Sequence, residues 1–205
     1  KRQILDHAYL LHDFSSTPNQ TPSWELSKRL DVLDQTAIFC SFSKVTFGGG
    51  GLSFAAAGVK LFNLLVRQRA SMIVCSDKVN QMRHLEFLKN KKDILHHMSK
   101  HADLVKPKFE IAFKALDSLG SEIGSYNKPT GGYFISYNTS KPIAKRVIAL
   151  CKEAGVLITP AGSTYPHFED PADSNIRLAP TFLDLEDLKD AMEVFTTSLQ
   201  IAFAE

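Results

Sequence analysis

A tetraglycine, Gly48–Gly51, separates two short apolar runs, and this arrangement constrains the fold of the first hundred residues more than any other feature. The run before it, Thr36–Ser41, is rich in β-prone residues, which predicts a buried strand. The run after it, Leu52–Ala57, predicts a second strand. Because glycines carry no Cβ, the loop lets a bulky group approach its backbone closely. Lys44 lies where the first strand gives way to this loop.

Helical and strand periodicities alternate along this part of the chain, and longer helices follow. We expect a partial α/β large domain over 1–105 and a small α+β domain, with its linking helix, over 106–205. Pro107 predicts either a kink in a helix or the start of one. The remaining expected elements are a strand from 3 to 10 that runs into a loop, a turn at 19–22, helices over 23–33, 59–69, 99–119, 143–154 and 185–201, a helix capped by Asp77, and strands over 133–137, 156–159 and 175–179.

Composition excludes several classes of protein. The net charge of +2 and the scattered basic residues indicate no nucleic-acid partner. Charged and polar residues interrupt the longest apolar region, Leu52–Val66, so we expect no membrane span. Three widely spaced cysteines, Cys40, Cys75 and Cys151, argue against a disulfide framework and favour the cytoplasm, and we expect Cys151 to be buried packing. The chain lacks an initiator Met and starts in apolar sequence, which predicts a fragment of a larger protein.

Lys44 has companions that suit an amine bound covalently to an aldehyde cofactor. Asp6 and Tyr9 place an acid and a phenol at the end of the first strand. A pyridine-based electron sink needs a carboxylate near its ring nitrogen, and a phenol tunes the ring hydroxyl. Arg177 stands in an apolar run and needs an anion, either a substrate carboxylate or a structural ion-pair partner. For Lys44 alone, the plainer alternative is a lysine that marks a strand end.

Four histidines, His84, His96, His97 and His101, lie on helical sequence. The spacing of His97 and His101 would suit a metal pair. No glutamate accompanies them in an HExxH pattern, so we expect surface histidines and no metal site.

The motifs together resemble a known family. Their order is Asp-x-Ala-Tyr, Ser-x-Ser-Lys, a Gly-rich loop, Gly-Gly-Tyr-Phe and Asn-Ile-Arg, which is similar to fold-type I pyridoxal-phosphate aminotransferases. The resemblance is to the bacterial aspartate aminotransferase-like branch, in its C-terminal portion, and it covers nearly the whole chain. The segments that carry it are Ser43–Phe47, Asp77–His84, Pro129–Phe134 and Thr159–Gly162.

The resemblance implies a role for each matching residue. Lys44 would form the Schiff base with pyridoxal 5'-phosphate and shuttle the substrate proton. The remaining residues would bind cofactor or substrate: Asp6 at the pyridinium nitrogen, Tyr9 at the ring hydroxyl, Ser41 and Ser43 at the phosphate, Arg177 at the substrate α-carboxylate, and Asn175 as the residue that orients Arg177.

The implied function is transfer of an amino group between an amino acid, aspartate or similar, and a 2-oxo acid, in a homodimer. Alternatives are an aminotransferase-like domain of a regulator, or another pyridoxal-phosphate lyase such as a β-eliminating enzyme. The sequence departs from the family pattern at two places. Leu52 stands where many relatives carry an arginine that binds the cofactor phosphate. The second arginine, which binds the distal carboxylate of the substrate in dicarboxylate-specific relatives, has no secure counterpart. Candidates for the latter are Arg67, Arg69, Lys78 and Arg83. We expect the fragment to be inactive alone, since the resemblance places other cofactor-binding residues before Asp6.

Overall fold

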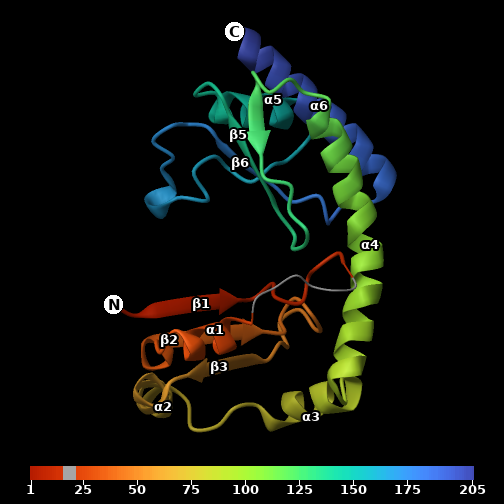
Figure 1. Cartoon of the computed structure of the whole chain (residues 1–205). Helices are drawn as coiled ribbons and strands as arrows, with labels where there is room; N and C mark the ends of the chain where they lie inside the picture. Colours follow the sequence, from red (N-terminus) through yellow and green to blue (C-terminus); the bar gives the residue numbers. More distant parts are fainter. Residues whose placement is uncertain (16–21) are drawn as a thin grey trace. The chain divides into compact units, whose positions relative to one another are not determined.

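The structure, a computed structural model, describes residues 1–15 and 22–205 (Figure 1). It comprises two compact units, Lys1–His101 and Ala102–Glu205. The boundary between them falls within one helix, α4 (Lys91–Asp117), and the domain boundary expected after residue 105 lies a little further along the same helix. The turn predicted at 19–22 lies, except for its last residue, outside the described residues.

The first unit contains a three-stranded sheet in the order β1 (Gln3–His7), β2 (Thr36–Ser41), β3 (Ser53–Ala57), drawn side by side in Figure 1. β1 and β2 are parallel, whereas β3 runs antiparallel to β2. A parallel pair needs a crossover, and this one contains α1 (Ser23–Arg29) and a short 3₁₀ turn, η1 (Leu33–Gln35). The carboxyl ends of β1 and β2 therefore meet at one edge of the sheet.

Polar caps set several helix boundaries in this unit. Besides α1 it contains α2 (Val59–Met72) and α3 (Lys78–Phe87). Asp77 caps α3 as predicted, because its carboxylate accepts the N–H of Asn80 at 2.9 Å. α4 begins at Lys91 and not at the predicted residue 99, because the side-chain oxygen of Asn90 accepts the N–H groups of residues 92 and 93 and caps the helix there. α4 continues through Pro107, so no helix starts there.

α1 is shorter than the helix predicted over 23–33. It ends at Arg29, and Asp31 adopts a φ of 52°, in the left-handed region that an α-helix does not tolerate.

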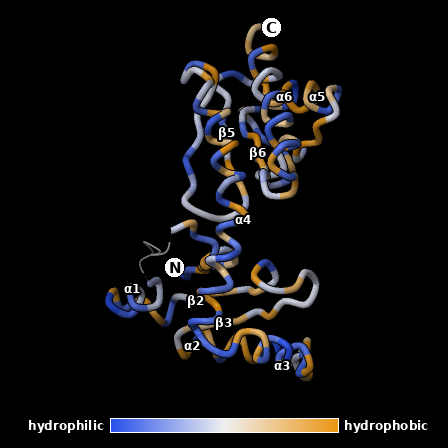
Figure 2. The backbone as a smooth tube through the Cα atoms, turned by 90° about the vertical axis from the view of Figure 1, so that its right-hand side faces the viewer, coloured by the Kyte–Doolittle hydropathy of each residue, from blue (hydrophilic) through white to orange (hydrophobic). Residues whose placement is uncertain are grey.

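Much of the apolar surface of the first unit is exposed. No residue of α2 is buried, and Figure 2 shows hydrophobic stretches around α2 and α3. Large apolar side chains exposed in such numbers are unusual on a protein surface and are typical of regions that other protein segments cover. The large apolar side chains exposed on β3, α2 and α3 are Phe54, Val59, Phe62, Leu64, Val66, Met72, Val79, Met82, Leu85 and Phe87.

The second unit contains an antiparallel sheet in the order β4 (Gly124–Tyr126), β5 (Ile135–Thr139), β6 (Asn175–Leu178). Its other elements are the end of α4, α5 (Ala144–Glu153), a 3₁₀ turn η2 (Pro166–Phe168) and α6 (Leu185–Ala204). β5 alternates buried and exposed residues, so one face lies in the core.

A row of aromatic rings joins the helices of this unit to its sheet. The rings of Phe113, Tyr126, Tyr137 and Phe195 follow one another at centroid distances of 5.9, 6.5 and 6.0 Å. α5 packs against α6, and Cys151 on α5 is fully buried, as predicted.

The strand predicted over 156–159 does not form. Gly155 has a φ of 90° and ends α5 in a Schellman motif. In that motif the N–H of Gly155 bonds the carbonyl of Lys152, and the N–H of Val156 bonds that of Cys151. The first residue of the expected strand therefore caps a helix instead of pairing. In the described part of the chain, no helix combines the length and apolar character needed to cross a bilayer.

Candidate functional site

Lys44 lies on a single backbone turn directly after β2. The N–H groups of Val45 and Thr46 both donate to the carbonyl of Phe42 at 3.0 Å, which closes the turn. Lys44 is exposed, and its Nζ lies 5.5 Å from the ring centroid of Tyr9, within cation–π range. The structure thus brings two of the residues predicted from sequence, Lys44 and Tyr9, close together.

Asp6 lies at the same edge of the sheet, near the end of β1. Its Oδ1 accepts the N–H of Ala8 at 3.1 Å, and the carboxylate is exposed. Burial, aided by the nearby Asp6 carboxylate, raises the pKa of the Cys40 thiol on β2. Cys40 is therefore a poor nucleophile, and Lys44 is the reactive candidate at this edge.

Ser41 and Ser43 form a small hydroxyl cluster beside the glycine loop. The hydroxyl of Ser41 donates to Ser43 Oγ at 2.9 Å and accepts the N–H of Ser43 at 3.1 Å. A Cβ at Gly51 would lie 2.3 Å from Ser43 Oγ and 2.4 Å from its Cα, which only glycine avoids. Asn80 on α3 holds the loop, because its amide donates to the carbonyl of Gly50 at 2.7 Å.

Two of the four histidines contact the turn that carries Lys44, and the sequence pattern did not predict these contacts. His84 is buried, not on the surface: its Nδ1 donates to the carbonyl of Asn80 at 2.8 Å, and its Nε2 lies 2.7 Å from Thr46 Oγ1. His97 contacts the carbonyl of Val45, and of the four histidines only His96 is exposed. The described residues contain no group of three or more His, Cys, Asp or Glu side chains placed to hold a metal ion.

His12, a residue that sequence reasoning passed over, is also buried in this unit. Burial lowers its pKa below the ordinary histidine value, and the charge of Lys44 acts in the same direction. Burial likewise lowers the pKa of His101, whose ring meets that of His12 edge-on at 5.4 Å. Both imidazoles are therefore neutral near pH 7.

Arg177, on β6 of the second unit, has an incompletely satisfied guanidinium. Its Cζ lies 4.7 Å from the ring centroid of Phe134, and its Nη2 reaches Thr159 Oγ1 only at 3.4 Å. Its Nε is buried and has no hydrogen-bond partner among the described residues. Within that same set, no carboxylate pairs with it. The structural ion pair, one of the two alternatives for this arginine, is absent there, and the donor set suits an external carboxylate.

Asn175, two residues before Arg177, is bound to the sheet and its neighbouring loop. Its amide nitrogen donates to Ser136 Oγ at 2.9 Å and Asn138 Oδ1 at 2.8 Å, and its oxygen accepts from Thr164 at 2.8 Å. None of the hydrogen bonds in the described chain joins it to Arg177. Asn175 therefore fixes β6 and its neighbours, and any effect on the guanidinium is indirect.

Asp170 anchors this strand and was not found from sequence. Its carboxylate accepts the N–H groups of Ala172, Ser174 and Asn175. Burial raises its pKa, but the three N–H donors outweigh burial and the net pKa is lowered. The sequence Asp170-Pro-Ala-Asp173 is typical of a turn, and this pattern could have indicated the role of Asp170.

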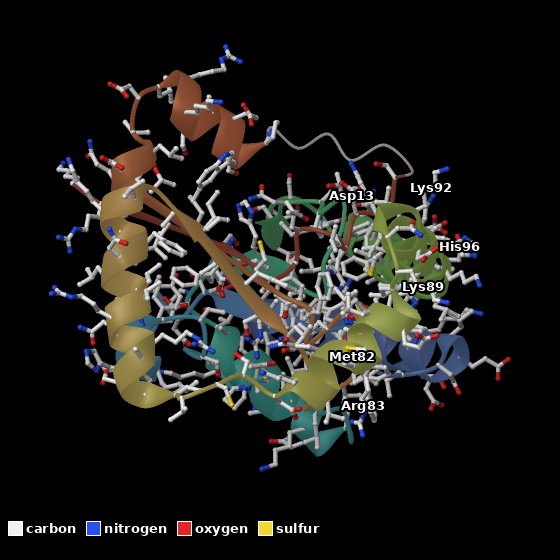
Figure 3. All side chains as sticks on the ribbon, turned by 90° about the horizontal axis from the view of Figure 1, so that it is seen from below. Asp13, Met82, Arg83, Lys89, Lys92 and His96 are labelled. Carbon is white, nitrogen blue, oxygen red and sulfur yellow. The ribbon has the colours of Figure 1, made fainter. Side chains whose placement is uncertain are left out.

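The four candidates for a distal carboxylate are exposed in the first unit. Arg69 donates to Ser76 Oγ at 2.5 Å, and Arg83 projects from the outer side of α3 (Figure 3). The contacts of these four residues do not favour any one of them as the residue that binds a distal carboxylate.

Comparison with known proteins identifies the chain. A family model described as aspartate amino-transferase matches residues 2–205. The chain belongs to this family. A Mycolicibacterium smegmatis protein named as an aminotransferase is 37% identical over 215 residues, which cover 100% of this chain and 48% of that protein. The resemblance stated from the motifs is therefore confirmed. The chain spans about half the length of the curated relatives it matches.

Solved structures of aminotransferases share the fold. The crystal structure of an aspartate transaminase from Corynebacterium glutamicum matches with a TM-score of 0.92 and 32% identity, covering 99% of this chain and 49% of that one. LysN of Thermus thermophilus, an α-aminoadipate aminotransferase complexed with N-(5'-phosphopyridoxyl)-L-leucine, matches with a TM-score of 0.81 at 23% identity over 98% of this chain and 50% of its own. The expected α/β fold of the type I aminotransferases is confirmed.

Proposed function

We propose that the protein to which this chain belongs is a pyridoxal-phosphate-dependent aminotransferase that moves an amino group between an amino acid and a 2-oxo acid. The observation that carries this is the exposed Lys44, presented beside Tyr9 at the carboxyl edge of a parallel strand pair in a chain of the aminotransferase family. Pyridoxal phosphate, when bound, supplies an electron sink for the substrate carbon that loses its proton.

The residues present fit the cofactor. Ser41 and Ser43 offer clustered hydroxyls for its phosphate, and the space beside them is kept free of side chain at Gly51. Leu52 stands where the family resemblance implies a phosphate-binding arginine, so the hydroxyls and backbone N–H groups would carry the phosphate here. Asp6 would hold the ring nitrogen, and Tyr9 the ring hydroxyl.

Lys44 and Arg177 act on the substrate. The Nζ of Lys44 would accept the substrate Cα proton and return it, which makes this amine the general base and acid. Arg177 would bind the α-carboxylate through its planar fork, and its buried Nε donor, unpartnered in the described structure, supports that role.

We propose aspartate or a similar amino acid as the donor, on the basis of the family match. Initial rates with aspartate, glutamate, alanine and phenylalanine would test this, and a preference for phenylalanine or alanine over aspartate would overturn it.

We further propose that this chain works as part of a longer polypeptide, inactive without the remainder, in a cytoplasmic homodimer. Support comes from its half-length match to relatives and from the apolar side chains exposed on β3, α2 and α3. Light scattering of the longer protein would test the homodimer. Activity assays of residues 1–205 alone would test whether the chain is inactive without the remainder. Turnover by the isolated 205 residues would contradict this proposal.

Half-reaction spectroscopy of the longer protein tests the reaction itself. Mixed with amino acid alone, an aminotransferase converts its cofactor to the pyridoxamine form and releases a stoichiometric 2-oxo acid without ammonia. Steady release of ammonia would indicate a β-eliminating lyase. Ligand binding with no conversion would indicate a regulatory domain.

A further inference from the structure

We infer that His97 is a positioning residue for Lys44: its ring N–H binds the carbonyl next to the lysine and fixes the turn that presents the amine. This inference rests on the proposed role of Lys44. His97 Nε2 lies 2.6 Å from the carbonyl oxygen of Val45. Since a carbonyl can only accept, the imidazole must carry its hydrogen on Nε2.

The turn needs such a donor. Residues 42–46 form one turn that does not continue as a helix, so no helical N–H donors follow it, and no backbone hydrogen bond recorded among the described residues reaches the carbonyl of Val45. Imidazoles supply them instead: His97 binds the carbonyl of Val45, and His12 Nε2 lies 3.1 Å from the carbonyl of Lys44. Two side chains distant in sequence thereby hold the two consecutive peptide groups that follow the lysine Cα.

His97 is itself held in place. It lies on α4, and its ring meets that of Phe87, the last residue of α3, edge-on at 5.1 Å. Val45, the residue it binds, is 3% exposed and anchors the turn in the core of the first unit. Thr46, the next residue, contacts the buried His84. The turn is therefore bound by side chains from α3 and α4 at successive positions.

Fixing this backbone matters for catalysis because the lysine side chain is long and flexible. The protein can restrict the path of Nζ only by fixing the Cα from which the side chain extends. Small displacements of a reacting group cost large factors in rate, whereas substrate binding depends on other contacts. Loss of the His97 hydrogen bond should therefore lower kcat more than it raises KM.

The test uses three variants of the full-length protein with cofactor. His97→Phe keeps a ring against Phe87 but removes the N–H, and His97→Gln restores an N–H donor. His96→Phe is the matched control, since His96 is the neighbouring exposed histidine and projects from the outer side of α4 (Figure 3). Borohydride labelling at Lys44 and thermal unfolding are measured beside steady-state kinetics.

We expect His97→Phe to retain the Lys44 label and its fold, to lose about ten-fold in kcat, and to keep KM within about two-fold. We expect His97→Gln to recover most of that loss and His96→Phe to match the parent. Equal kcat in His97→Phe and His96→Phe overturns the inference. A kcat loss that merely parallels lowered melting, with no recovery in His97→Gln, also overturns it. An unsubstituted protein without turnover would instead overturn the proposed function and, with it, this inference.

Discussion

Asp170 provides a quantitative test of how the Arg177 strand is held. Its Oδ2 accepts the N–H groups of Ser174 and Asn175, both at 2.8 Å, and its Oδ1 accepts that of Ala172 at 2.9 Å. Asp170→Asn keeps the shape of the side chain but replaces one acceptor oxygen with an NH₂ donor. If the remaining oxygen faces Ser174 and Asn175, the NH₂ group faces the N–H of Ala172, and that bond is lost.

The cost follows from the kind of bond removed. A hydrogen bond to a charged group contributes about 1.5–3 kcal/mol, and Asp170 is only 8% exposed, so water replaces it poorly. We therefore expect Asp170→Asn to lower the free energy of local opening by about 2 kcal/mol, which corresponds to roughly thirty-fold faster amide exchange. Hydrogen exchange resolved at residues 172, 174 and 175 measures it.

The pH dependence gives a second check. The pKa of Asp170 is lowered in the folded state, so its contribution is complete above the unfolded value of about 3.9. The contribution is lost as the pH falls through the lowered folded pKa. The difference in local opening free energy between the parent and Asp170→Asn should therefore reach its full value at about pH 6 and shrink below about pH 3.9. Asp190→Asn, the same change at an exposed position on α6, is the control. Equal exchange at these amides in parent and Asp170→Asn would refute the reasoning.

Three further changes test other parts of the account. Arg177→Lys should lower kcat/KM for the amino acid about 100-fold, because a lysine cannot make the paired hydrogen bonds of the fork, and steady-state kinetics with an unchanged fold would show it. Gly51→Ala should weaken cofactor binding at least about ten-fold in an absorbance titration, because its Cβ would lie 2.4 Å from a backbone Cα, whereas Gly48→Ala, with nothing within 4 Å, should not. Leu199→Ala should cost about 2–5 kcal/mol in urea unfolding because the side chain is fully buried, while Ile201→Ala, 47% exposed, should cost far less.

Local sequence signals predicted the elements whose causes are themselves local. β2 was predicted with its observed bounds because an apolar, β-prone run stands between turn-forming residues. Asp77 was recognised as a helix cap because the cap is encoded within one turn. The lysine, acid and phenol of the first unit were grouped by the chemistry of a pyridine cofactor and by the family resemblance, and the parallel pairing of β1 and β2 places all three near the carboxyl ends of those strands.

The errors came from contacts that periodicity does not encode. The 156–159 run had strand composition, but Gly155 turned its first residue into a helix cap. β4 is only three residues long and depends on pairing with β5. His84 was expected at the surface because no metal-binding pattern accompanies the four histidines, yet it is buried against Thr46, which lies far away in sequence. Such long-range hydrogen bonds are visible only in the folded chain.

The central claim is that the amine of Lys44 bonds covalently to the cofactor. Borohydride reduction of the full-length protein with pyridoxal phosphate, followed by peptide mapping, tests it most directly. The account predicts one pyridoxyl label, on Lys44, and its loss in Lys44→Ala. A label on a different lysine, or undiminished labelling of Lys44→Ala, would contradict it.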